Sequence, residues 1–192
     1  MRKTLLLFIV ASLGFMVSCT SKEEKMQGLA KDYVAEQLKT YEQLTGKITI
    51  DKFEFGDVDS LFESYDETKE GKVAKERVDS LKSVYEKADD PWLPSTETSR
   101  KRASETKRAY DMEQLQYCEK KLAFKGSFKG WKLKTIISYY NSGGKAEQDS
   151  MFVFFSPEKD KVIGAKSLKS IAESKKATQK LIDIIKDIYK IK

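Results

Sequence analysis

The spacing of hydrophobic positions changes along this chain, and it predicts which segments are helices and which are strands. In residues 22–44 apolar side chains return every three or four positions, which is the period of an amphipathic helix. Its stripe consists of Met26, Leu29, Tyr33, Val34, Leu38 and Tyr41. In residues 47–56 two isoleucines and then two phenylalanines alternate with polar residues, on opposite parity. One strand with a bulge near Asp51 would bring both pairs to one face, and a strand buried on both sides is the alternative.

The middle of the chain is polar and predicts a pair of long helices. Residues 47–92 carry 8 basic and 13 acidic side chains, whereas residues 95–134 carry 11 basic and 5 acidic ones. The prolines of 90–94 break the helical pattern between them, and Ser95 or Thr96 would cap the second helix. We therefore expect a helical hairpin inserted over about 66–121, in which the basic helix folds back on the acidic one.

The remaining strands are predicted in residues 122–165. A short strand is expected to begin at Leu122 and Phe124. Alternation is clear in 131–140, glycines follow in 141–144 for a hairpin turn, and the return strand is 148–155. A second turn leads to a short strand at Val162-Ile163, and helical spacing resumes in the C-terminal segment. We expect that last helix to pack on the sheet, and a basic helix lying on a membrane is the alternative.

The N-terminal segment has the features of an export signal. Arg2 and Lys3 precede an apolar run, Leu5–Val17, that is too short to cross a bilayer. The segment resembles a bacterial lipoprotein signal, whose lipobox ends at a cysteine, although Met16 stands where leucine is usual. The resemblance implies that residues 1–18 are removed and that Cys19 carries lipid on its sulfur and its amine, with 19–25 as a tether. A plain secretory signal cleaved elsewhere is the alternative.

Composition narrows the chemistry that the chain can perform. It has no histidine, which removes Ser-His-Asp and Cys-His nucleophile systems and the histidine-dependent zinc motifs. If Cys19 is lipidated, Cys118 has no intrachain partner, so we expect a small buried hydrophobe, with an intermolecular disulfide as the alternative. The sequence contains no catalytic constellation and no metal-ligand spacing above background, so we expect no catalytic residue, no metal and no cofactor.

Two groups of side chains are candidates for binding. The first is the basic run Arg100, Lys101, Arg102, Lys107 and Arg108. It would suit a phosphate-bearing glycolipid or an acidic polysaccharide, whereas nucleic acid is not expected without a recognition motif in an exported protein. Pairing with the preceding helix is its simpler role. The second group would line a concave sheet face, although core packing is its simpler role, and it comprises Trp131, Tyr139, Tyr140 and Phe154.

Three further stretches resemble small envelope lipoproteins of Gram-negative bacteria whose activity is not known. They are Ala30-Lys31-Asp32-Tyr33-Val34, Gly130-Trp131-Lys132-Leu133, and the turn Asn141-Ser142-Gly143-Gly144 leading to Phe152-Val153-Phe154-Phe155. The resemblance covers most of the chain and implies one cystatin-like or NTF2-like α+β domain over 26–192. Its antiparallel sheet of about four strands would be packed by N- and C-terminal helices.

Taken together, these patterns predict a non-catalytic envelope lipoprotein. We expect it to be exported to the outer membrane or cell surface, anchored to the membrane through Cys19, and to bind an envelope protein or a glycan. A small-ligand carrier or inhibitor that uses the sheet face is the alternative. The third hypothesis is an enzyme that works through carboxylates or lysine.

Overall fold

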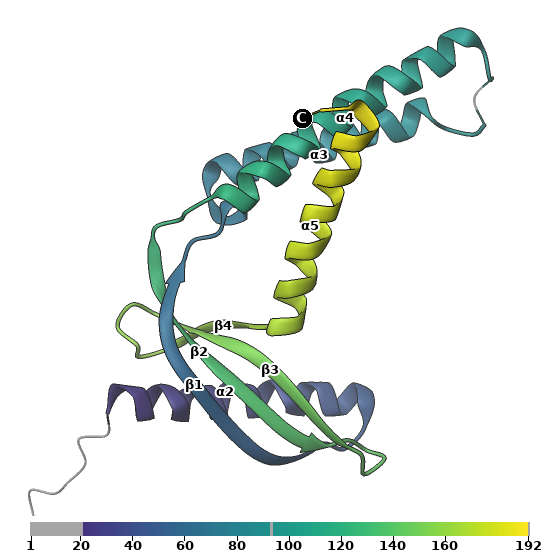
Figure 1. The fold of residues 1–192 in the computed structure, drawn as a ribbon. Coiled ribbons are helices and arrows are strands. Elements are labelled where there is room, and N and C mark those ends of the chain that lie inside the picture. The colour runs from purple at the N-terminus through teal and green to yellow at the C-terminus, as the bar shows by residue number, and fades with distance from the viewer. Residues whose placement is uncertain (1–20, 93, 192) are drawn as a thin grey trace, which may run out of the picture. The chain divides into compact units, whose positions relative to one another are not determined.

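The computed structural model describes residues 21–92 and 94–191, and it has the α+β architecture expected from the sequence (Figure 1). The helices are α2 (Lys22–Thr45), α3 (Lys69–Ala88), α4 (Glu97–Ala123) and α5 (Leu168–Tyr189), with a short 3-10 turn η1 (Tyr65–Glu67) before α3. The strands are β1 (Thr49–Phe62), β2 (Phe128–Tyr140), β3 (Ala146–Phe155) and β4 (Val162–Ser167). They form one antiparallel sheet in the order β1-β2-β3-β4, with the α3–α4 hairpin inserted between β1 and β2. No helix among the described residues is long and apolar enough to cross a membrane.

The described residues group into two compact units. The sheet unit contains α2 and most of the sheet, namely residues 21–59, 131–149 and 153–164. The helical unit contains the hairpin and α5, namely residues 60–130, 150–152 and 165–191. Each unit has buried residues of its own and is described separately below.

Helix α2 covers one face of the sheet (Figure 1). Met26, Ala30 and Val34 repeat at a spacing of four and are at most 1% exposed, so they form the buried side of the helix. The sheet contributes residues that alternate along β2 and β3, namely Leu133, Ile137, Val153 and Phe155. The helix begins earlier than the tether of 19–25 would allow, because Ser21 and Glu24 cap it reciprocally at Lys22.

Strand β1 shows the change of parity that the sequence predicted. Asp51 and Lys52 are both exposed, which interrupts the alternation at the position expected for a bulge. Beyond them Phe53 and Phe55 stack with ring centroids 6.3 Å apart, and the ammonium of Lys31 on α2 lies 5.8 Å from the Phe55 centroid. The two phenylalanines therefore lie on the side of the strand that α2 covers.

Thr135 is a polar residue in the middle of the apolar face of β2. It is fully buried, and its hydroxyl has no hydrogen-bond partner among the described residues. An unsatisfied buried hydroxyl costs about 1–3 kcal/mol. Thr135→Val, which keeps the shape and removes the hydroxyl, should therefore raise the free energy of unfolding by about 1 kcal/mol.

The matched control is Thr135→Ser, which keeps the hydroxyl and removes the methyl group. It should lower the free energy of unfolding by about 1 kcal/mol, because a buried carbon is lost. Urea unfolding followed by the fluorescence of Trp131, in a Trp92→Phe background, measures both changes within the sheet unit. Destabilisation by the valine variant would show that the hydroxyl is satisfied in solution.

Helices α3 and α4 form the predicted hairpin, but α4 is longer than expected. It continues to Ala123, so Leu122 lies in its last turn and Phe124 is its C-cap rather than part of a strand. The physical reason is that the first strong helix breaker after 97 is Gly126. Helix α4 also packs against α5, a contact that was not predicted. Ile182 and Ile185 of α5 pack with Leu115 and Cys118 of α4.

Cys118 is the small buried hydrophobe that the sequence predicted. Its side chain is 4% exposed within the core between α4 and α5, and burial raises the pKa of its thiol. A thiol that is buried and protonated reacts slowly with another chain. The intermolecular disulfide considered above therefore has little structural support.

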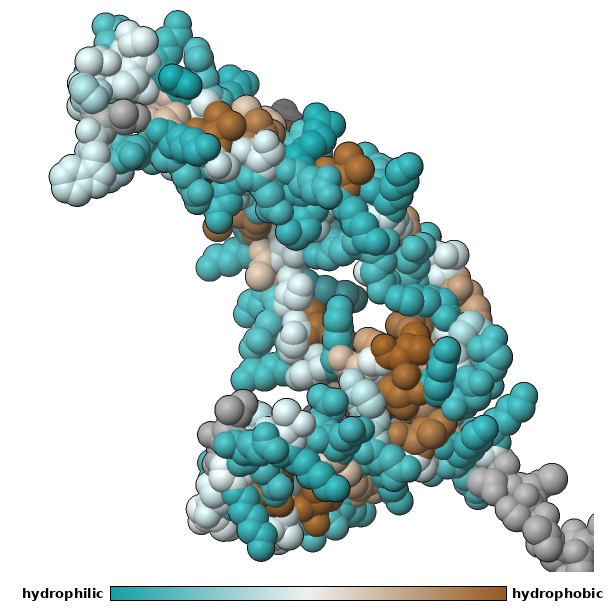
Figure 2. Space-filling model, turned by 180° about the vertical axis from the view of Figure 1, so that it is seen from behind, coloured by the Kyte–Doolittle hydropathy of each residue, from teal (hydrophilic) through white to brown (hydrophobic). Residues whose placement is uncertain are grey.

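The charge complementarity predicted for the hairpin is found only in part: Glu70 of α3 pairs with Lys120 of α4, but farther along the hairpin Arg77 of α3 pairs with Glu113 of α4, with the signs reversed. Helix α3 carries six basic and four acidic side chains, so it is not the acidic helix that was expected. The acidic residues of 47–92 lie mainly in β1, in η1 and in the loop after α3. Hydrophilic side chains cover most of the hairpin surface in the view of Figure 2.

At the hairpin base, the carboxylate of Asp66 in η1 binds two side chains of α4. Lys121 Nζ lies 2.6 Å from Asp66 Oδ2, and the Tyr117 hydroxyl donates to Asp66 Oδ1 at 2.6 Å. Burial alone would raise the pKa of the Asp66 carboxyl, but these two hydrogen bonds outweigh it and lower the pKa. Lys120 and Lys129 pair in the same region with Glu70 and Glu67.

Candidate binding site at the end of the helical hairpin

The loop between α3 and α4 is fixed by capping at the start of α4. Thr96, one of the two positions predicted for the cap, is the N-cap of α4. Its Oγ1 accepts a hydrogen bond from the Ser99 backbone N–H at 3.1 Å. The Ser99 hydroxyl in turn lies 2.9 Å from the Thr96 backbone N–H and donates to the Pro94 carbonyl at 2.7 Å. The hydroxyl groups at this turn are therefore used to hold the loop and the helix together.

Trp92 lies in this loop with its side chain in solvent. It is 91% exposed, the largest exposure among the large hydrophobic side chains described. Its backbone N–H donates to Asp90 Oδ1 at 2.9 Å, which fixes the turn but leaves the ring in solvent. Tryptophan is enriched at protein interfaces and is common among the residues that dominate their binding energy.

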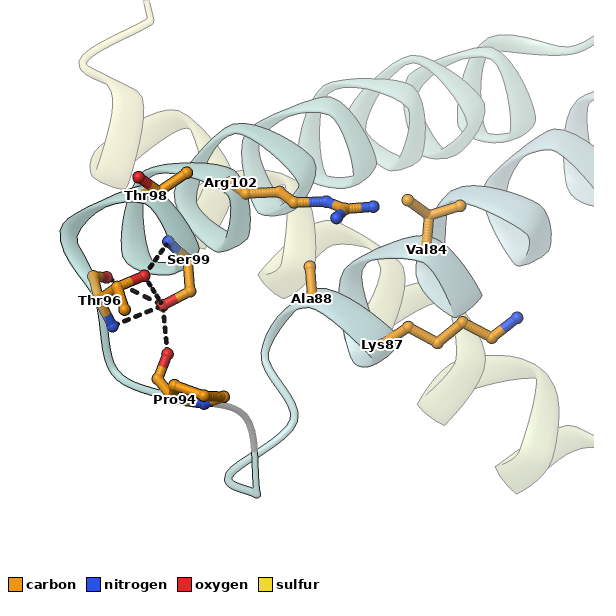
Figure 3. A pocket seen from close by; sticks show the side chains of 8 residues that line it. All are labelled: Val84, Lys87, Ala88, Pro94, Thr96, Thr98, Ser99 and Arg102. Atoms are coloured by element: carbon orange, nitrogen blue, oxygen red, sulfur yellow. Dashed lines mark hydrogen bonds between the residues drawn. The ribbon is translucent and has the colours of Figure 1, made fainter.

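A pocket of about 620 Å³ lies beside this loop, between the end of α3 and the start of α4 (Figure 3). The atoms that line it are mostly apolar, because the polar side chains contribute carbon atoms as well. The lining residues are Val84, Lys87, Ala88, Pro94, Thr96, Thr98, Ser99 and Arg102. Arg102 extends from α4 toward Val84 of α3 in Figure 3. Two of the lining residues are cationic and none is a carboxylate. The pocket is within the size range of ligand sites and suits an apolar group that carries a negative charge.

Below the pocket, aromatic contacts fix the two helices. The rings of Tyr85 on α3 and Tyr110 on α4 stack at 6.2 Å with an angle of 7° between their planes. The Tyr85 hydroxyl donates to Asp89 Oδ2 at 2.9 Å, and this hydrogen bond, with burial, raises the pKa of Tyr85. Lys107 Nζ lies 5.7 Å from the Tyr85 centroid and 2.6 Å from Asp111 Oδ2. The stack holds α3 and α4 together where the pocket ends.

The basic run predicted as one anionic-surface contact divides into two parts. Arg100, Lys101 and Arg102 are exposed at the start of α4 and form no salt bridge with the described residues. Lys107 forms a salt bridge with Asp111, and the guanidinium of Arg108 lies 5.8 Å from the centroid of the Tyr189 ring of α5. Contact of these five side chains with an anionic surface stays a prediction; among them Lys107 and Arg108 also have contacts within the helical unit.

The four aromatic residues proposed for a sheet pocket do not share one face. Tyr139 and Tyr140 are successive residues of β2, so their side chains point to opposite sides of the sheet. Trp131 donates through Nε1 to the Pro157 carbonyl at 3.0 Å and lies under the Lys159 ammonium, 3.9 Å from its ring centroid. The Tyr139 hydroxyl lies 3.1 Å from Glu147 and from Asp149. Phe154 is partly buried on β3.

Sequence reasoning found Arg102 but missed the other pocket residues. The α3 residues Val84, Lys87 and Ala88 looked like ordinary helix surface, and only the contact with α4 brings them beside Arg102. One signal was present: a tryptophan between two prolines has no helical or strand pattern to bury it. The predicted lipidation residue, Cys19, lies outside the described residues.

Comparisons of the chain with protein-family models, with curated proteins and with solved structures found no match. The resemblance to envelope lipoproteins therefore stays a prediction. Among the described residues no three His, Cys, Asp or Glu side chains come together as a metal site would require.

Proposed function

We propose that the protein is a lipid-anchored, non-catalytic binding protein of the cell envelope and that it contacts its partner with the hairpin end, defined here as residues 84–92 and 94–102. The partner is an envelope protein or a glycan that presents an anionic group beside an apolar one. One observation carries the proposal: the loop that bears a tryptophan 91% exposed also contributes Pro94 to a pocket with two cations.

The chemistry of the hairpin end supports binding rather than packing. A Trp ring in water leaves its large apolar surface unburied, and burial of that surface is a favourable term available to a partner. Arg102 can offer a bidentate hydrogen bond to a carboxylate or phosphate, and it forms no salt bridge with described residues. The hydrogen bond from Ser99 to the Pro94 carbonyl holds the start of α4 in place before a partner arrives, which lowers the entropic cost of binding there.

The start of α2 supports work close to a membrane. The lipobox resemblance places the anchor at Cys19, and the helix begins at Lys22, only three residues later. At about 3.5 Å per residue this tether spans at most about 11 Å. A lipidated Cys19 would therefore hold the first turn of α2 at the bilayer surface, on the outer membrane or the cell surface.

The test is photo-crosslinking in living cells with a benzophenone amino acid at position 92. We expect a defined adduct at position 92 and a yield about tenfold lower when Arg102 is replaced by alanine, the effect of losing a contact worth about 1.4 kcal/mol. Protease sensitivity of the adduct separates a protein partner from a glycan.

The matched control is the same photoreactive residue at Lys72, an exposed position of α3 at the other end of the hairpin. Equal crosslinking at positions 72 and 92, or no adduct at either, would refute the hairpin end as the contact site. The Arg102→Ala variant should keep the circular dichroism of the native chain, because its side chain forms no salt bridge there.

A further inference from the structure

Helix α5 has a second apolar side in addition to the one that packs on α4. Ile182 and Ile185 are buried against α4, but Ile184 and Ile188 are 45% and 55% exposed. With Ala177 and Leu181 they form a stripe spaced 4, 3 and 4 residues apart, which is the spacing of a coiled-coil seam. Leu181 is partly buried, because it also packs against the core between α4 and α5, whereas Ala177, Ile184 and Ile188 are exposed. The α5 stripe, defined by these four residues, is thus apolar and regular, and three of its four side chains are exposed.

We propose that the α5 stripe pairs with the α5 stripe of a second copy of this chain, with the two helices antiparallel. In this register Leu181 of each copy faces Ile184 of the other, and Ile188 faces Ala177. The contact is isologous, so one two-fold axis generates every pair twice.

The charges beside the stripe favour this partner and this direction. Lys180 and Asp187 lie on the same flank, each directly before a stripe residue, and neither forms a salt bridge with the described residues. In the antiparallel register Lys180 of each copy lies beside Asp187 of the other, which gives two opposite-charge pairs. A parallel pairing would place Lys180 beside Ile185 of the second copy.

The pairing surface is small, since four side chains bury far less than the roughly 1,200–2,000 Å² of a stable interface. Pairing should therefore be weak in dilute solution and should be measured in the membranes of cells that make the full chain. Cysteine crosslinking suits this case, because it traps a weak contact and reports which residues meet.

The experiment uses two variants, Ala177→Cys and Ile188→Cys, with different epitope tags. Antiparallel pairing brings position 177 of one copy to position 188 of the other, while like positions stay 11 residues, or about 16 Å, apart along the axis. Mild oxidation should give a disulfide-linked heterodimer when both variants are made together and only background when either is made alone. The chain with its native cysteines sets the background. Equal crosslinking of the single variants, or none in the mixture, would overturn the proposal.

A charge exchange gives an independent measurement. Asp187→Lys should lower the heterodimer yield about fivefold, because two attractive pairs become repulsive, and adding Lys180→Asp should restore it. Restoration by a second charge reversal cannot come from damage to folding. Failure of the double variant to recover the yield would contradict the antiparallel register.

Discussion

Replacing Cys19 by alanine should abolish incorporation of radioactive palmitate into the protein. The lipobox resemblance makes this sulfur and its amine the sites of acylation, and an alanine offers no sulfur to receive the first lipid. Each buried CH₂ of an acyl chain contributes about 0.8 kcal/mol to membrane binding, so several chains on one residue give durable anchoring. The label is read after immunoprecipitation of the full chain, and the expected change is from clear incorporation to background.

Cys118→Ala is the control for the second cysteine. Its thiol is buried in the core between α4 and α5, so the palmitate label should be unchanged. Persistence of the label in the Cys19 variant would exclude the anchor. Absence of the label from the native chain would favour the plain secretory signal, and the short distance from Cys19 to α2 would then have no bearing on the membrane.

Gly71→Ala should lower the free energy of unfolding of the helical unit by about 3 kcal/mol. This is a large effect for the addition of one methyl group. Gly71 is in the first turn of α3, and a Cβ atom there would meet the Tyr65 carbonyl oxygen at 1.8 Å. That carbonyl is held by the Thr68 hydroxyl at 2.7 Å, whose oxygen also accepts from the Gly71 N–H. The clash therefore involves backbone that cannot move without breaking the cap of α3.

The matched control is Gly28→Ala in α2, where a Cβ would meet nothing within 4 Å. It should raise stability by about 1 kcal/mol, because alanine favours a helix interior over glycine. Urea unfolding followed by far-ultraviolet circular dichroism compares the two. Similar shifts for both variants would show that the turn before α3 relaxes freely around an added methyl group.

Local patterns were sufficient to predict the sheet unit. The stripe of α2 and the alternation in β2 and β3 each record burial on one side of a regular element, and the glycines of 141–144 mark the turn between strands. The same logic gave the change of parity near Asp51 in β1, because it is visible in the order of residues. Periodicity works here because α2 and one face of the sheet bury regularly spaced residues of each other, such as Met26, Ala30 and Val34 of the helix.

The helical unit was harder to predict because its contacts join residues far apart in the sequence. Summed charge suggested an acidic and a basic helix, yet two of the ion pairs at the hairpin base come from η1, where Asp66 lies beside Lys121 and Glu67 beside Lys129. The partner of α5 could not be deduced either, since its isoleucines occur on two sides of the helix. The pocket at the hairpin end exists only once α3 and α4 lie together.

The position of β1 at the edge of the sheet has a consequence for solubility. Its 14 residues present a long row of backbone groups on one side, a template on which another strand could add. Charged side chains interrupt this strand repeatedly, at Asp51, Lys52, Glu54, Asp57 and Asp59. A second β1 brought alongside would have to bring like charges together, which opposes edge-to-edge aggregation.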